Sequence, residues 1–228
     1  MFGSITAAPA FGQDADALYA DRASLASAER AAVIWTAELA EHPRSFDAAS
    51  KLARACYWLG GHAAGQDRRK FLERGIDAGR KAVSLEPSRP EGHFWIAANM
   101  GALAESFGLS QGLKYRGAIK SELETVLRLD PGFMAGSANR ALGRWYFRVP
   151  RLFGGSNKRA EEHLRASLKY DEHSTITHFF LAEVLVDERR KDEARRELQQ
   201  VLDAPFNPEW AAEDQDFKQR ARALLARL

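Results

Sequence analysis

Residues 141–158 read ALGRWYFRVPRLFGGSNK and join two segments of helical character. Leu142, Gly143 and Tyr146 recur at helical spacing, and the amphipathic run 160–170 follows the stretch. Between them lie a proline and two adjacent glycines, which are residues that interrupt helices. The stretch also places three arginines among four aromatic residues. It therefore predicts a pair of helices joined by a loop.

A motif that recurs along the chain predicts further pairs of the same kind. It consists of a small residue, a larger one four positions on and a proline eight positions further, as in the second helix of a tetratricopeptide repeat. Glycine or a bulkier residue replaces the small one in two copies, and the last two copies lack the proline. The copies are Ala31/Trp35/Pro43, Gly75/Gly79/Pro87, Ile119/Leu123/Pro131, Ala160/Leu164/Glu172 and Ala194/Leu198/Phe206.

The last positions of these motifs are 44, 44, 41 and 34 residues apart, and only the last spacing equals that of a standard repeat. We predict an all-α fold: an α-solenoid of about five tetratricopeptide-like helix pairs over residues 14–228, with a C-terminal capping helix after Asn207-Pro208. The extra residues are expected to enlarge loops inside the pairs, at Gly60–Gly65, Gly108–Gly112 and Val149–Ser156.

Local signals support helix boundaries and close helix packing. Ser88 and Glu91, with Pro90 between them, read as a capping box that starts a helix. Glycines inside helical segments each cost about 1 kcal/mol relative to alanine, so we expect them to allow neighbouring helices to approach closely. These glycines are Gly75, Gly79, Gly101 and Gly143.

Composition excludes several classes of function. The 33 Lys and Arg balance 31 Asp and Glu, and the signs are interspersed, so no nucleic-acid partner is expected. The single cysteine, Cys56, excludes an internal disulfide framework and a cysteine-based zinc site. No apolar run is long enough to span a membrane.

Neither a cofactor, a metal site nor an enzyme is predicted. The six histidines are scattered, without a zinc-binding helix motif. Phe153-Gly154-Gly155-Ser156 lacks the lysine and the spacing of a phosphate loop, and Ser156 is expected to cap a helix. The alternative is a cryptic enzyme in which Cys56 acts as a nucleophile with His62 or His93 as its base, although nothing in the sequence orients such a pair.

The N-terminus gives one indication of location. Residues 1–13 are small and apolar up to Ala10-Phe11-Gly12, and then polar, as in the end of a secretory signal peptide. A disordered terminus is the alternative. We therefore expect a periplasmic or secreted protein, with a cytoplasmic one as the alternative.

Several of these features together resemble the tetratricopeptide-like T component of TRAP transporter systems. They are residues 87–95 (PSRPEGHFW), the Leu129-Asp-Pro-Gly hinge, Leu142-Gly-Arg-Trp-Tyr146 and Pro150-Arg-Leu-Phe-Gly-Gly-Ser156. The Leu-Gly-Arg-Trp element is also similar to the regulator of microtubule dynamics family. The first resemblance implies a non-catalytic accessory of periplasmic solute uptake, with a periplasmic solute receptor as partner. The alternative is a cytoplasmic tetratricopeptide scaffold for assembling protein complexes.

A binding groove is expected on the concave side, because the first helices of tetratricopeptide pairs line it. Their repeat positions predict an arginine-and-aromatic surface formed by Arg54, Tyr57, Trp58, Phe94, Arg140, Arg144, Phe147, Arg148 and Phe179. Arginine binds carboxylates through two parallel hydrogen bonds, so the expected ligand is a protein partner or a small carboxylate. Alternatively, the arginines are paired with Glu91, Glu105 and Glu183 and the aromatics are core residues.

Two more expectations concern packing and assembly. Trp35, Trp95 and Trp145 are expected to pack between helices, since repeat arrays bury large residues between pairs. The apolar loop residues Leu152-Phe153 would give the chain a surface for homo-oligomer formation.

Overall fold

The structure is a computed structural model that describes residues 11–228. These residues form α-helices and one short 3₁₀ turn, without β-strands in the range described. The elements are α1 (Phe11–Ala20), α2 (Leu25–Glu41), α3 (Phe46–His62), α4 (Gly65–Leu85), α5 (Pro90–Phe107), α6 (Leu109–Leu129), α7 (Phe133–Arg148), η1 (Arg151–Phe153), α8 (Asn157–Leu168), α9 (Thr175–Asp187), α10 (Lys191–Asp203) and α11 (Ala211–Leu225).

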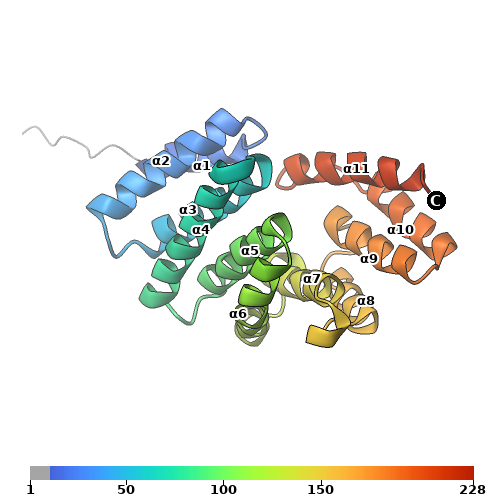
Figure 1. Cartoon of the computed structure of the whole chain (residues 1–228). Helices are drawn as coiled ribbons and strands as arrows, with labels where there is room; N and C mark the ends of the chain where they lie inside the picture. Colours follow the sequence, from blue (N-terminus) through green and yellow to red (C-terminus); the bar gives the residue numbers. More distant parts are fainter. Residues whose placement is uncertain (1–10) are drawn as a thin grey trace, which may run out of the picture.

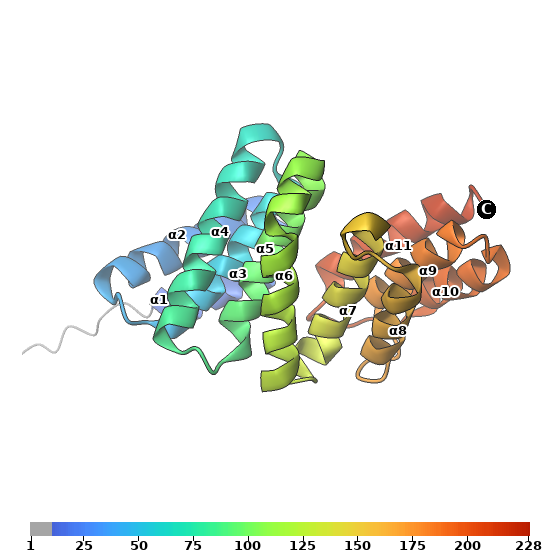
Figure 2. The same ribbon diagram turned by 60° about the horizontal axis from the view of Figure 1, so that its bottom comes forward.

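The helices form consecutive antiparallel pairs that stack into a curved array (Figures 1 and 2). Each helix packs on its partner, from α1 with α2 to α9 with α10, and α11 follows as the last helix. The first helices of successive pairs also contact one another, α3 with α5, α5 with α7 and α7 with α9. This confirms the predicted solenoid of five tetratricopeptide-like pairs with a C-terminal helix, and it places the first helices in an inner row.

In the α3–α4 and α5–α6 pairs, the extra residues lengthen helices instead of enlarging loops. Helices α3 and α4 have 17 and 21 residues, whereas α9 and α10 have 13 each. Two residues separate α3 from α4, and Gly108 alone separates α5 from α6. The predicted loops at Gly60–Gly65 and Gly108–Gly112 are therefore wrong. Gly60 and Gly61 continue α3, and the left-handed φ of 84° at Gly108 allows a reversal within one residue.

The third predicted loop is present, and its closing cap is as expected. Residues 149–156 connect α7 to α8 through the turn η1. Ser156 precedes α8, and its hydroxyl accepts a hydrogen bond from the Arg159 backbone N–H at 3.3 Å. Leu152 is almost fully exposed at the outside of this connection.

The predicted capping box at the start of α5 does not form. Arg89, and not Ser88, is the residue before the first helical position, and it makes no side-chain cap. Glu91 instead accepts a hydrogen bond from the Arg89 guanidinium at 2.6 Å. Pro90 still begins the helix, where its missing N–H is tolerated.

Close approach of helices at glycine is confirmed at three of the four predicted positions. A Cβ on Gly143 would lie 2.6 Å from Leu164 Cγ on α8, and one on Gly79 would lie 2.7 Å from Ile96 Cγ1 on α5. Gly75 makes room for the buried amide of Asn99. A Cβ on Gly101 would have no atom within 4 Å, so this glycine is not needed for a close approach of helices.

This difference predicts opposite effects of alanine at two helical glycines. Gly143→Ala is expected to lower the free energy of unfolding by about 1–3 kcal/mol, because its methyl group meets Leu164 and the Ala160 carbonyl. Gly101→Ala has open space and should raise it by up to about 1 kcal/mol through helix propensity. Urea unfolding of the two variants measures both effects, and equal signs would contradict the packing described.

The tryptophans predicted to pack between helices are buried. Trp35, Trp95 and Trp145 are each at least nine-tenths inaccessible to solvent. The Trp145 indole N–H donates to the Arg116 carbonyl at 2.9 Å, and the Trp58 N–H donates to the Arg22 carbonyl at 2.7 Å. The Trp35 N–H, in contrast, has no hydrogen-bond partner among the described residues.

Helix α11 does more than cover the end of the array, because it reaches back to the first helix pair (Figure 1). Arg22, between α1 and α2, donates to both carboxylate oxygens of Glu213 at 3.0 and 2.5 Å and to the Glu209 carbonyl at 2.5 Å. His62 of α3 lies 3.4 Å from Asp216. We call this set of contacts the end-to-end closure.

Most of the predicted signal remnant lies outside the described residues. The structure describes the chain from Phe11, where α1 begins, so the prediction for residues 1–13 stays a prediction. Among the described helices, none combines the length and the apolar character needed to cross a membrane.

Candidate functional site

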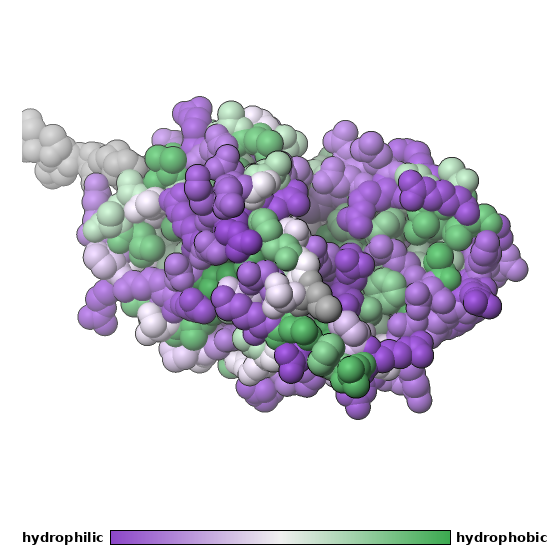
Figure 3. All heavy atoms as spheres, in the orientation of Figure 1, coloured by the Kyte–Doolittle hydropathy of each residue, from purple (hydrophilic) through white to green (hydrophobic). Residues whose placement is uncertain are grey.

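The predicted groove residues fall into distinct environments on the inner row of helices. Trp58, Phe94 and Phe179 are buried core residues and are not accessible to a partner. Tyr57 and Arg148 are exposed. Arg54, Arg144 and Phe147 are half-buried, and Arg140 is buried. The space-filling view shows hydrophilic and hydrophobic residues mixed over the face of the molecule that is turned to the viewer (Figure 3).

Arg144 lies at the centre of the inner row and is paired with two carboxylates. Its Nε and Nη2 atoms donate to the two oxygens of Glu105 on α5, at 2.8 and 3.1 Å. Its Nη1 donates to Glu183 on α9 at 2.5 Å, and its guanidinium lies 4.6 Å from the Phe180 ring centroid. Arg144 therefore connects α5, α7 and α9. For this arginine, the predicted alternative of pairing with Glu105 and Glu183 is the one observed.

The neighbouring residues leave part of the inner surface open to a partner. Arg148 lies 3.8 Å from Glu105, which is a looser contact than that of Arg144. Tyr57 packs against Trp95 with ring centroids 5.7 Å apart, while two-fifths of it remains exposed. The Arg54 guanidinium lies 4.3 Å from the centroid of Tyr19, a distance typical of a cation–π contact. The open surface is therefore basic and aromatic.

Arg140 differs from the other two arginines of α7. It is more than nine-tenths buried, yet it makes no hydrogen bond or ion pair with any residue in the range 14–228. Burial lowers its pKa, and Tyr57 and, after it, the carboxylates of Asp171 and Glu213 partly oppose this effect. A buried guanidinium without a contacting acceptor is unusual, because desolvation of a charge is costly.

A cavity of about 250 Å³ lies beside Arg140. It is bounded by the start of α7, the α8–α9 connection and the segment that leads into α11, and it is open to solvent on one side. Its walls are both charged and apolar, formed by Met134, Ala135, Arg140, Asp171, His173, Ser174, Thr175, Ile176, Pro205, Phe206, Asn207, Pro208, Trp210 and Asp214. The sequence predicts Arg140 as a binding residue but does not predict this cavity, because the cavity walls come from three separate regions of the chain.

Arg220 is a groove residue that the repeat pattern of the sequence does not predict. It comes from α11, and its guanidinium lies 4.4 Å from the Phe179 ring centroid and 4.7 Å from that of Phe217. The predicted role of α11 was to cover the end of the array, and no pattern in its sequence signals that it turns back along the inner row. Its amphipathic spacing alone does not reveal which surface it meets.

The residues considered for catalysis are not arranged for it. Cys56 is buried, and burial raises its thiol pKa to about 12, so the reactive thiolate does not form near neutral pH. His62 contacts the Trp58 carbonyl at 2.9 Å, and His93 lies 2.5 Å from Glu122. Over the described part of the chain, His, Cys, Asp and Glu side chains do not gather in threes that would hold a metal ion.

A histidine arrangement recurs in two repeats. His93 and His178 are each the fourth residue of a first helix, α5 and α9. In each case Nδ1 faces a glutamate of the second helix, at 2.5 Å for Glu122 and 2.6 Å for Glu197. The other ring nitrogen faces a backbone carbonyl six residues earlier, at 3.0 and 2.8 Å. The arrangement fixes the pairing of the two helices.

Fold stability is expected to fall with rising pH through His178. Burial opposes the charged ring, but the contacts with Glu197 and the Glu172 carbonyl outweigh it and raise the His178 pKa. The stabilisation is therefore complete below about pH 6.5 and is lost as pH rises through the raised folded-state pKa. Urea unfolding across this range should show the fall, and His178→Gln should flatten it.

His173 provides the matched control for this titration. It lies five residues away, is largely exposed and approaches Glu172 only to 3.8 Å. His173→Gln should leave the pH dependence of stability as in the wild type. A wild-type slope that persists in His178→Gln would refute the assignment.

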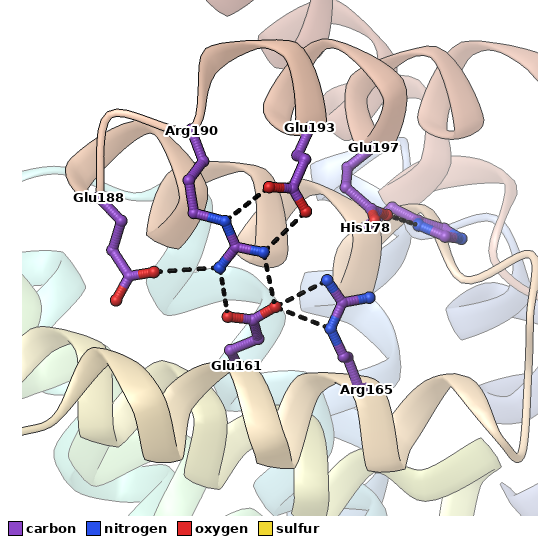
Figure 4. Close-up of polar contacts among 7 residues, drawn as sticks. All are labelled: Glu161, Arg165, His178, Glu188, Arg190, Glu193 and Glu197. Carbon is purple, nitrogen blue, oxygen red and sulfur yellow. Dashed lines mark hydrogen bonds and ion pairs between the residues drawn. The ribbon is translucent and has the colours of Figure 1, made fainter.

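An ion-pair network next to His178 joins the last two pairs (Figure 4). Arg190, just before α10, contacts Glu161 of α8 and Glu193 of α10 at 2.7 Å each, and Glu188 at 3.2 Å. Arg165 also contacts Glu161, at 2.7 Å. The network holds α8 against the start of α10 and lies outside the groove, so its role is structural.

Fold and inner surface together define a tetratricopeptide-type helical-repeat protein. A tetratricopeptide-repeat model matches residues 155–212. The family model described as regulator of microtubule dynamics protein 1-3 matches residues 11–161, which is more than half of the chain. The chain belongs to the regulator of microtubule dynamics family.

A curated relative supports this assignment over a shorter range. Regulator of microtubule dynamics protein 1 of Caenorhabditis elegans is 31% identical over 81 residues, which are 36% of this chain and 36% of the relative. The match thus spans about a third of that protein's length.

Solved structures share the fold. The tetratricopeptide protein TTC0263 of Thermus thermophilus has a TM-score of 0.70 and 21% identity, over 94% of this chain and 98% of that one. PilF of Pseudomonas aeruginosa has a TM-score of 0.58 and 16% identity, over 95% and 92%. Of the two predicted resemblances, the comparisons support the regulator of microtubule dynamics family and give no support to the TRAP T component.

Proposed function

We propose that this protein is a non-catalytic scaffold that binds a segment of a protein partner along the inner row of helices and so assembles a protein complex. The observation that carries the proposal is the continuous inner surface formed by α3, α5, α7 and α9, with exposed basic and aromatic side chains. The name of the curated relative, a regulator of microtubule dynamics, agrees with a role exercised through other proteins.

The charges of this surface indicate which kind of segment it binds. Arg144 is neutralised by Glu105 and Glu183, so it holds helices together and is not free for a ligand. Arg148 and Tyr57 remain exposed. Arginine and tyrosine at a protein interface favour an acidic segment with apolar side chains. The preferred partner is therefore an acidic, amphipathic segment.

The test replaces the exposed groove residues without disturbing the core. The double variant Tyr57→Ser/Arg148→Glu removes the aromatic surface and reverses the charge. Its affinity for a partner, identified by crosslinking to the wild type and then purified, should fall more than about tenfold. Calorimetry at two salt concentrations should also show weaker binding of the wild type at high salt.

A matched control uses the outer side of the array. Val33 and Arg30 are exposed on α2, and Val33→Ser/Arg30→Glu introduces the same types of change there. This variant should bind like the wild type, and circular dichroism should show equal helicity for both variants. If the groove variant keeps wild-type affinity, or the control loses as much, the inner row is not the binding surface.

A further inference from the structure

Arg140 presents an unsatisfied positive charge to the cavity beside it. The side chain is more than nine-tenths buried and lines the cavity, and no described residue within hydrogen-bond distance accepts from it. None of its guanidinium nitrogens is completely shielded from solvent, so a ligand can approach them. A guanidinium that is largely removed from water and has no contacting acceptor is stabilised when it binds an anion such as a carboxylate.

The same cavity also presents negative charge. Asp171 and Asp214 both line it. Each uses one oxygen within the protein, Asp171 accepting from the His173 N–H at 3.0 Å and Asp214 from the Thr175 hydroxyl at 2.5 Å. The second oxygen of each takes no hydrogen bond from the described residues. A free phosphate would be repelled by these two carboxylates, and a simple cation would be repelled by Arg140.

The remaining walls fix the size and polarity of an occupant. Met134, Phe206 and Trp210 supply apolar surface, and four-fifths of Phe206 is exposed at the rim. The volume of about 250 Å³ is below the roughly 300–1,000 Å³ of sites for drug-sized ligands. A small molecule with both charges and an apolar side chain fits these walls.

We propose that this cavity binds a small zwitterion, a free apolar amino acid, with its carboxylate on Arg140, its ammonium group on Asp171 and Asp214, and its side chain against Phe206 and Trp210. The site goes beyond the scaffold function proposed above and does not depend on it. Because its walls include α7, the α8–α9 connection and the segment that leads into α11, an occupant contacts the last two helix pairs and the start of α11 at once.

The experiment tests both charges of the ligand. Phenylalanine, leucine and methionine are titrated separately into the purified chain by calorimetry. For phenylalanine the analogues are 3-phenylpropanoate, which lacks the ammonium group, and phenethylamine, which lacks the carboxylate. For leucine they are 4-methylpentanoate and isoamylamine. For methionine they are 4-(methylthio)butanoate and 3-(methylthio)propylamine. At least one amino acid should bind, and each of its analogues should bind more than about tenfold more weakly, because each loses a charge-assisted contact.

Protein variants test the residues. Arg140→Gln and Asp214→Asn should each weaken binding of the amino acid more than about tenfold, and Asp214→Asn keeps an acceptor for Thr175. Arg30→Gln, an exposed change on α2, should leave the affinity unchanged. Thermal unfolding followed by circular dichroism shows whether each variant is folded. If Arg140→Gln does not fold, the affinities of Asp214→Asn and of the analogues test the proposal without it.

Three outcomes would overturn the proposal. The first is that none of the amino acids binds at concentrations up to about 10 mM, because so weak an affinity corresponds to a free energy too small for two charge-assisted contacts. The second is that a carboxylate analogue binds as well as its amino acid, which would indicate a simple anion site. The third is that folded Asp214→Asn keeps wild-type affinity, which would place the ammonium group elsewhere.

Discussion

Replacing Glu213 by alanine is expected to lower the free energy of unfolding by about 3–5 kcal/mol, a large effect for a residue on the last helix. Its partner Arg22 is buried, and the two side chains are only 8% and 17% exposed. Without Glu213, the guanidinium keeps a single acceptor, the Glu209 carbonyl, in a place from which water is largely excluded. Urea unfolding measures the loss.

The control for this prediction removes both charges. Arg22→Met/Glu213→Leu leaves no unpaired ion in the interface, and replacing a buried ion pair by apolar residues is often close to neutral. The double variant should therefore be more stable than Glu213→Ala alone. If Glu213→Ala costs less than about 1 kcal/mol, the pair is not the buried contact described here.

Replacing Trp35 by alanine should lower the free energy of unfolding by about 3–5 kcal/mol, through lost apolar contact and the cavity left behind. Trp35 is fully buried and packs against Tyr19 with ring centroids 5.8 Å apart. Because its indole N–H has no partner among the described residues, Trp35→Phe should cost much less than Trp35→Ala.

Trp58 gives the comparison for Trp35. Its N–H donates to the Arg22 carbonyl, so Trp58→Phe leaves that acceptor without its bond and should cost more than Trp35→Phe. Thermal or urea unfolding of the two phenylalanine variants measures the difference. Equal losses would show that the hydrogen bond contributes little.

The order and number of helix pairs could be predicted because they depend on local sequence. Pro43, Pro87 and Pro131 mark the ends of second helices, and apolar residues between them keep a helical period. The loops could not be placed in the same way. Gly60 and Gly61 look like breaks, yet packing of the long α3 on α4 keeps them helical, since tertiary contacts override a weak local preference.

The candidate site could be predicted only in part. Arg140, Arg144 and Arg148 are spaced four residues apart, so their common side of α7 follows from sequence. Which of these arginines is paired does not follow from sequence, because the partners of Arg144, Glu105 and Glu183, lie 39 residues before and after it in the chain. The cavity walls and Arg220 depend on where α11 lies, which no local pattern determines.

The end-to-end closure also bears on how the chain folds. In an open repeat array each pair contacts only its neighbours, so folding spreads stepwise and either end frays alone. Here Arg22 and Glu213 are 191 residues apart, and their contact closes a loop of almost the whole chain. That step carries the largest entropy of loop closure in the molecule, so it should come last in folding. Hydrogen exchange at the two ends should consequently rise and fall together, as in one cooperative unit.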